Sequence, residues 1–184
     1  MVNQQFIFIH MRKKKMNNTY IDYEFHQIQE REIQAAINVE QTCFPPHEAC
    51  SVENMQDRIS KASELFYVAI NKTNNQVVAI LNGIATNEQV FQDEFFTNAS
   101  LHQKDGENIM LTGLAVLDDY RNKGIAKALM HYYVNEMKKQ HKKRLLLTCL
   151  EDKVAMYQMF GFMDNGIANS TWGNETWHEM IMEL

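Results

Sequence analysis

The residues with the clearest potential for chemistry lie in one stretch, IMLTGLAVLDDYRNKGIAKAL, at residues 109–129. An apolar run that ends at Val116 predicts a buried strand, and residues 121–126 open a patterned helix after a polar break. The first backbone N–H groups of a helix have no internal partner and lie at the positive end of its dipole, so they can bind phosphate oxygens. Gly124 lets the backbone approach a ligand closely, and Ala126 keeps a nearby position small. The stretch therefore predicts an anion-binding site.

Two common nucleotide-binding loops are excluded, because neither G-x-x-x-x-G-K-[ST] nor G-x-G-x-x-G occurs in the sequence. The alternative interpretation of residues 121–126 is a plain helix start that binds nothing. A basic residue in the loop, Arg121, favours ligand binding over a generic exposed turn.

The composition is that of an ordinary globular protein. The 184 residues fit one domain with a proper core, and the 45% apolar and 22% charged residues exclude disordered and collagen-like chains. A net charge of −5, from 18 Lys+Arg against 23 Asp+Glu, disfavours a nucleic-acid partner. Cys43, Cys50 and Cys149 form no CxxC pair, so neither a disulfide framework nor a zinc site is expected. We therefore expect a cytoplasmic protein with reduced thiols.

The N-terminal residues 1–18 are interpreted as an appendage outside the domain, either disordered or upstream of the true start. Their apolar part, residues 6–9, is too short for a signal peptide or a membrane span, and the basic run follows it instead of preceding it. No other stretch of the sequence approaches membrane-spanning length, so no membrane partner is expected.

The elements that must position the anion site form a mixed pattern along residues 19–184. Strands are predicted at residues 20–28, 66–70, 77–85, 109–116, 144–149, 162–168 and 176–184. Helices are predicted at residues 30–42, 51–62, 123–140 and 152–160. In the first helix Ile33 and Ile37 recur at helical spacing with Ala36 and Glu40 beside them, and Ser51 can cap the second helix. Strands and helices thus mix, with an antiparallel end.

Three motifs follow one another in an order that is typical of one known family. They are the strand end Leu114-Ala115-Val116, the loop Arg121-x-x-Gly124-x-Ala126 and the later Tyr157-x-x-x-Gly161-Phe162. The loop alone is a weak signal, but its combination with the downstream tyrosine motif is specific. With these motifs, residues 19–184 resemble the GCN5-related N-acetyltransferase (GNAT) superfamily.

Within that superfamily the chain looks most like the arylalkylamine N-acetyltransferase branch, including its bacterial relatives. The similar segments are LAVLDDYRNKG, TCLEDKVAMYQMFGF and the Phe44-Pro45 pair after the first helix. The sequence departs from the vertebrate enzymes of this branch, which carry a His-x-His pair where this chain has Met110 and Thr112. The proton route that those histidines provide is therefore open here.

The resemblance implies a single α/β (α+β) domain, with a mixed and mostly antiparallel twisted sheet flanked by helices. It implies that the central strands splay to admit acetyl-CoA, and that no metal is needed. The pantetheine arm would pair with the backbone at Leu114, Ala115 and Val116, where an N–H group could stabilise the oxyanion of acyl transfer. The residues implied for the pyrophosphate, mainly through backbone N–H groups with Arg121 adding charge, are Arg121, Asn122, Lys123, Gly124, Ile125 and Ala126.

Tyr157 is the predicted catalytic residue. A hydroxyl beside the sulfur of CoA could donate its proton to the leaving thiolate, which is general acid catalysis by position. The alternative is a core role, which is common for a tyrosine on a short amphipathic helix. Cys149 ends a strand near the expected cofactor site, but without a partnered histidine it is interpreted as buried and inert.

The attacking amine must be neutral, so the reaction needs a base or a water chain. Candidate bases are the acids and histidines Glu88, Glu94, His47, His102 and His178, and Thr112 could organise a water. None stands out, and a surface or packing role is the alternative for each acid and histidine.

Aromatic residues in the loops and the closing hairpin could form a pocket for the amine. They are Phe44, Phe95, Phe96, Trp172 and Trp177. Core packing is the alternative for each of them. The segment at residues 86–108 is unusually long for a connection between two strands, which is typical of functional or disordered loops, and its aromatic content suggests a covered small-molecule site.

These features predict an acyltransferase that moves an acetyl group from acetyl-CoA to a primary amine by direct attack in a ternary complex. The expected acceptor is a small arylalkylamine or related metabolite, and the expected state is a monomer or a homodimer. A non-catalytic CoA-binding or regulatory module is one alternative, and acetylation of peptide or protein amines is another. The sequence leaves the acceptor, the base and the oligomeric state open.

Overall fold

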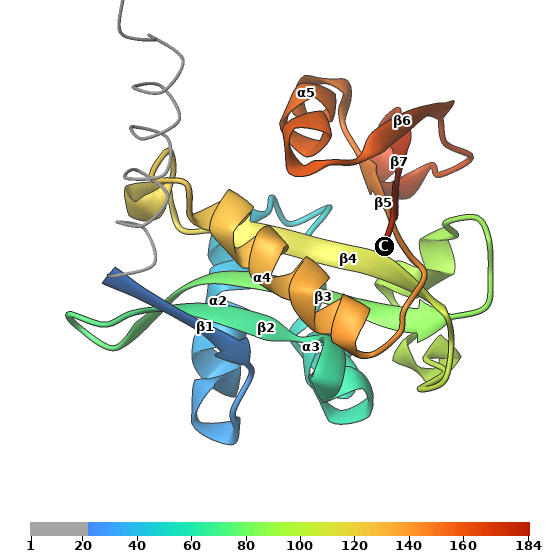
Figure 1. The fold of residues 1–184 in the computed structure, drawn as a ribbon. Helices are drawn as coiled ribbons and strands as arrows, with labels where there is room; N and C mark the ends of the chain where they lie inside the picture. The colour runs from blue at the N-terminus through green and yellow to red at the C-terminus, as the bar shows by residue number, and fades with distance from the viewer. Residues whose placement is uncertain (1–21) are drawn as a thin grey trace, which may run out of the picture.

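A computed structural model describes residues 22–184, so the appendage expected at residues 1–18 lies outside the described residues. Within residues 22–184, seven strands form one sheet in the order β1-β2-β3-β4-β5-β7-β6 (Figure 1). The strands are β1 (Tyr23–Gln27), β2 (Tyr67–Asn71), β3 (Gln76–Thr86), β4 (Asn108–Val116), β5 (Arg144–Cys149), β6 (Met163–Ile167) and β7 (His178–Glu183). The α-helices of this part are α2 (Ile33–Cys43), α3 (Val52–Ala62), α4 (Ile125–Lys139) and α5 (Glu151–Phe160).

The pairing of β4 with β5 is the exception in a sheet whose other described pairs are antiparallel. These two strands run parallel and pair only from Asn108 opposite Arg144 to Met110 opposite Leu146. Beyond Met110 they separate, and Figure 1 shows β5 leaving the plane of β4 toward α5 and β7. The prediction of a mixed, mostly antiparallel sheet with splayed central strands is confirmed.

Helices cover both faces of the sheet because each presents one apolar side to it. On one face α2 and α3 bury Ile37 and Met55 against β2 and β3. On the other face α4 buries Leu129 and Tyr133 against the same strands. None of the helices in residues 22–184 has the length and apolar character that crossing a membrane requires.

The start of α3 forms as its sequence predicts. The Ser51 side chain accepts a hydrogen bond from the backbone N–H of Asn54 at 3.2 Å, which satisfies a donor that the first helical turn leaves free. The cap fixes where α3 begins and hence where Arg58, about two helical turns further on, meets the sheet.

The long segment between β3 and β4 is largely core. It contains two short 3-10 turns, Asp93–Phe96 and Ala99–Leu101, and buries Phe91 and Phe95 in one cluster with Met110 of β4. The segment is therefore mostly packing rather than the disordered or wholly functional loop that its length indicated. Of its residues, only Phe96, near the middle, lines the cavity described below.

An extra residue interrupts the ladder between β3 and β4. Asn82 lies opposite Gly113 and Gly83 lies opposite Leu111, so Thr112 has no partner on β3. Such a bulge bends a strand and changes the direction of the groups next to it. In β4 the bulge comes two residues after Met110, the last residue that pairs with β5, so the strand is distorted close to where it leaves that neighbour.

Candidate active site

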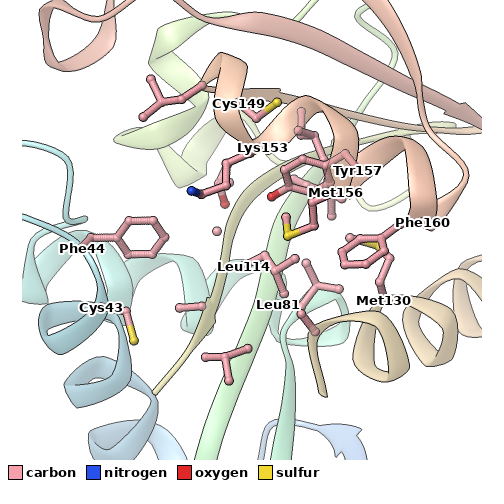
Figure 2. A pocket seen from close by; sticks show the side chains of 18 of the residues that line it. Cys43, Phe44, Leu81, Leu114, Met130, Cys149, Lys153, Met156, Tyr157 and Phe160 are labelled. Carbon is pink, nitrogen blue, oxygen red and sulfur yellow. The ribbon is translucent and has the colours of Figure 1, made fainter. Parts of the chain in front are cut away.

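A cavity of about 870 Å³ opens where β4 and β5 diverge. This volume is within the range of small-molecule sites. It is lined by the loop after α2, by β4, by the start of α4, by one side of α5 and by the loop between β6 and β7. Figure 2 shows Tyr157 and Lys153 extending from α5 toward the cavity, with Phe44 across it and Leu114 of β4 between them.

The open edge of β4 forms the floor of the cavity. Leu114, Ala115 and Val116 line it, and on the side of β5 the described residues give them no strand partner because that pairing ends at Met110. Backbone groups along this edge can therefore hydrogen-bond an extended ligand as a further strand would. These are the three residues that the resemblance implies for the pantetheine arm, and all three lie on this edge.

The start of α4 lies at one end of the same cavity. Asn122 and Gly124 adopt left-handed backbone angles, with φ of 60° and 82°, and the helix begins at Ile125. Gly124 in the capping position has no side chain to bond the free N–H groups, and the first turn carries no acidic residue. The N–H groups of this turn are thus available to an anion.

Five of the six residues predicted for the pyrophosphate line the cavity, namely Arg121, Asn122, Gly124, Ile125 and Ala126. Lys123 does not line it, because its Nζ lies over the ring of Tyr120, 5.1 Å from the centroid. The side chain of Lys123 therefore packs on Tyr120 instead of lining the cavity.

Arg121 supports the loop more directly than its predicted charge role suggests. Its Nε donates to the carbonyl oxygen of Val116 at 2.9 Å, and its Nη2 lies 2.9 Å from a carboxylate oxygen of Asp118. These contacts tie the end of β4 to the loop that follows. The guanidinium stays half exposed, so it also contributes positive charge at this end of the cavity.

Tyr157 lies on α5 with its ring against two phenylalanines. The centroid distances are 5.9 Å to Phe160 and 5.7 Å to Phe162, both in edge-on geometry, and Figure 2 shows the hydroxyl directed into the cavity. Burial raises the pKa of Tyr157 well above its usual range, and the nearby Cys149 adds to this. The hydroxyl is therefore protonated at neutral pH and able to donate.

Cys149 at the end of β5 also lines the cavity. Burial, with added repulsion from Asp164 and Asp152, raises the pKa of this thiol to about 12. A thiol with this pKa is a poor nucleophile, because only the thiolate reacts. The interpretation of Cys149 as buried and inert agrees with the structure.

An aromatic wall lines part of the cavity. Phe44, Phe96, Trp172 and Trp177 line it, and the rings of Phe96 and Trp172 are 5.1 Å apart. The prediction that Phe95 belongs to the amine pocket is wrong, because its side chain is 2% exposed and packs in the core. Its ring packs edge-on against Phe91, with centroids 5.7 Å apart.

None of the acids and histidines predicted as candidate bases lines this cavity, so that prediction is wrong. These residues are Glu88, Glu94, His47, His102 and His178. His102 accepts a hydrogen bond from the backbone N–H of Ala85 and donates to Glu64, so it fastens the segment after β3. Glu88 and Glu94 line a separate, smaller cavity. Thr112 does line the main cavity, through the bulge of β4.

His178 and His47 have local partners of their own. His178 bonds Asp164 within the hairpin of β6 and β7 at 3.1 Å. His47 is exposed and lies 3.4 Å from the carboxylate of Glu48. Both histidines thus belong to the rim or the surface.

Sequence reasoning missed the buried polar residues behind β4. Glu40 of α2 and Arg58 of α3 both line the cavity, at 3% and 2% exposure, and Asn82 of β3 lies beside them, fully buried. The periodicity of the first helix places Glu40 on its apolar side, and that position is the one signal available in advance. A glutamate on the apolar side of a helix needs an explanation, since buried carboxylates are rare.

The fold and the cavity together define a class of α+β protein with a cavity between two diverging strands and an uncapped helix start beside it. The chain belongs to the acetyltransferase (GNAT) family, whose sequence model matches residues 33–162. Members of this family are acetyl-CoA-dependent acetyltransferases. No curated protein matches the chain in a sequence comparison.

Solved structures share the fold at low sequence identity. The GNAT-like decarboxylase GphF, solved with isobutyryl-CoA, has a TM-score of 0.73 and 14% identity over 87% of this chain and 98% of that one. The ribosomal-protein-S18-alanine N-acetyltransferase from Escherichia coli has a TM-score of 0.64 and 19% identity over 88% and 93%. Arabidopsis thaliana Naa50, solved with the bisubstrate analogue CoA-Ac-MVNAL, has a TM-score of 0.67 and 15% identity over 89% and 99%. At these identities the likeness shows the fold alone.

Proposed function

We propose that this protein is an N-acetyltransferase that transfers the acetyl group of acetyl-CoA to the primary amine of a small, aromatic or otherwise apolar metabolite. One observation carries the proposal. A single cavity joins an anion-binding helix start, an open strand edge and an aromatic wall, which are the three surfaces that a nucleotide thioester and an amine acceptor need. The arylalkylamine-like branch suggested by the sequence motifs is part of this proposal.

The residues present fit acetyl-CoA. The uncapped N–H groups after Gly124 suit a pyrophosphate, and the unpaired edge of β4 at Leu114 and Val116 suits the amides of pantetheine. When bound, acetyl-CoA supplies an activated acetyl thioester. The chain itself orients this group against β4 and keeps bulk water from the acetyl end with the aromatic wall.

Tyr157 is proposed to supply the proton that the departing sulfur needs. Its hydroxyl lines the cavity and is held in place by the rings of Phe160 and Phe162. The amine attacks directly, since a neutral amine is already a competent nucleophile. The free cysteines among the described residues give no activated thiol for a covalent route, because burial raises the pKa of each thiol.

Contacts around the aromatic wall favour a small acceptor over a peptide. Trp172 contacts the ring of Phe96 and donates from its Nε1 to the carbonyl oxygen of Glu48 at 3.5 Å, so three separate loops meet at this wall. A peptide amine needs an open groove in this place. Aromatic faces and the carboxylate of Glu48 suit a compact organic cation instead.

The test is a thiol-release assay with acetyl-CoA and a panel of aryl alkylamines, polyamines, amino acids and peptides with free N-termini. We expect aryl alkylamines to give kcat/KM values at least tenfold above the best peptide. Faster turnover of peptides would move the protein to the peptide and protein N-acetyltransferases. Binding of acetyl-CoA in calorimetry without turnover on any amine would support the non-catalytic module.

A further inference from the structure

Four polar side chains lie together at β4, in a region where apolar residues are the rule, and hydrogen bonds join three of them. Arg58 donates from Nη1 to Oδ1 of Asn82 at 2.9 Å, and Thr112 donates from Oγ1 to the same oxygen at 2.8 Å. Glu40 accepts at Oε1 from the backbone N–H of Cys50 at 3.0 Å. Glu40, Arg58 and Thr112 line the cavity of the proposed active site.

Within the described residues, three buried polar atoms of these side chains have no hydrogen-bond partner: Nε of Arg58, Oε2 of Glu40 and Nδ2 of Asn82. A Cβ placed on Gly113 would lie 3.0 Å from Nδ2 of Asn82 and 3.5 Å from Oε2 of Glu40. The two atoms therefore converge beside the glycine that follows the bulge of β4, in the wall of the cavity.

Buried polar atoms without partners are costly, so each one in a folded protein calls for an explanation. A carboxylate that served only to hold the loop after α2 would need Oε1 for Cys50 and nothing more. The second oxygen is instead directed at β4, on the side where the acetyl group and the amine must meet. Its position is that of a group that accepts a proton from a ligand.

We propose that Glu40, held by the hydrogen bond from the backbone N–H of Cys50, takes the proton from the acceptor amine. The inference rests on the proposed function. The amine enters as an ammonium ion and gives one proton to the carboxylate of Glu40. The neutral nitrogen then forms the C–N bond as the C–S bond breaks, and the CoA sulfur takes a proton from Tyr157. The acylated nitrogen then passes its extra proton to the Tyr157 oxygen, which restores the hydroxyl. Glu40 releases the proton that it took from the ammonium ion to solvent.

The electrostatic surroundings of Glu40 suit this role. Burial raises the pKa of Glu40, while the hydrogen bond from Cys50 and the charge of Arg58 oppose that change. The other ionisable groups near Glu40 are the thiols of Cys43 and Cys50, whose own pKa values are raised by burial, so both are neutral at pH 7. A raised pKa brings the carboxylate nearer to the pKa of an amine, which makes the proton transfer less uphill.

The test compares Glu40→Gln with wild type in the pH dependence of kcat/KM. Glutamine can still accept the hydrogen bond from Cys50, so the loop keeps its anchor and only the basic group is lost. We expect a loss of about 100-fold or more at pH 7. The loss should shrink toward high pH, where more of the amine is already neutral, and binding of acetyl-CoA in calorimetry should be unchanged.

Glu48→Gln is the competing variant, because Glu48 lines the same cavity and is the other glutamate there. We expect it to raise the KM for the amine and to keep the acidic limb of the pH profile. Glu40→Asp, which keeps a base on a shorter arm, should recover part of the activity that glutamine loses. A Glu48→Gln variant that lost the acidic limb would overturn the assignment of Glu40.

A readout without turnover uses carboxyl carbon NMR of the full chain, with the signal that is missing in Glu40→Gln assigned to Glu40. We expect its titration midpoint to lie above the ordinary glutamate value of about 4.3. A wild-type pH profile in Glu40→Gln, or an ordinary midpoint, would overturn the inference while amine acetylation by the wild type still stood. Absence of acetylation by the wild type would instead remove the proposed function, and this inference with it.

Discussion

Replacing Tyr157 with phenylalanine separates catalysis from stability more cleanly than any other single change in the cavity. The phenylalanine ring keeps both edge-on contacts, at 5.9 Å to Phe160 and 5.7 Å to Phe162. The lost hydroxyl faces the cavity, so its removal leaves no buried group without a partner. We therefore expect the free energy of unfolding to change by less than about 0.5 kcal/mol, which corresponds to about 1–2 °C in Tm for a chain of this size.

Catalysis should respond very differently to the same change. Loss of a positioned general acid typically costs about 100-fold or more in rate, and two decades correspond to about 2.7 kcal/mol of transition-state stabilisation. The assay measures kcat by thiol release with the best amine of the panel, next to thermal unfolding of the same preparations. Met156→Leu, a volume-conserving change beside Tyr157 in the cavity, is the control and should keep most of the activity. A kcat within threefold of wild type would refute the assignment of Tyr157 as the acid.

Four other changes test the remaining links between sequence, fold and site. Gly124→Ala puts a side chain at φ 82°, so it should cost about 1–2 kcal/mol of stability and raise the Kd of acetyl-CoA about tenfold in calorimetry. Gly83→Ala places a Cβ 2.5 Å from the backbone oxygen of Met110, and chemical denaturation should show a loss of about 3 kcal/mol. Trp172→Ala removes the contact with Phe96 and should raise the KM of the amine about tenfold with the KM of acetyl-CoA unchanged. Because folding raises the pKa of Glu40, this residue contributes stability below its unfolded pKa, and that contribution is lost as pH rises through its folded pKa. In thermal unfolding at pH 7, Glu40→Gln should therefore be at least as stable as wild type.

Much of the fold could be predicted from the sequence, because its local signals agree with the tertiary structure. Ser51 caps α3 as its residue type predicts, and the left-handed angle at Gly124 is one that glycine adopts without strain. The apolar strands and the amphipathic helices fall within a few residues of their predicted bounds. The prediction that β4 and β5 separate came from the family resemblance, since periodicity carries no information about how far two strands stay paired.

The acceptor side of the site could not be predicted in the same way. The predicted histidines and acids were chosen by residue type, and long-range packing gives them other partners, such as Glu64 for His102 and Asp164 for His178. Glu40 was missed because its position on the helix indicated packing. Its spacing from Ile37 on one helix made it one more residue on the apolar side, and only the approach of β4 to α2 shows what that side faces.

The bulge at Thr112 gives a single physical cause for several features of the site. It follows the last pairing with β5 and sends the Thr112 hydroxyl to Asn82. It also brings Gly113, which has no side chain, opposite the free oxygen of Glu40. A side chain at position 113 would fill that space and crowd Asn82, because its Cβ would lie 3.0 Å from Nδ2. The chain instead keeps a buried carboxylate with an unused oxygen, and a local departure of this kind from good packing is expected where a protein binds its substrate.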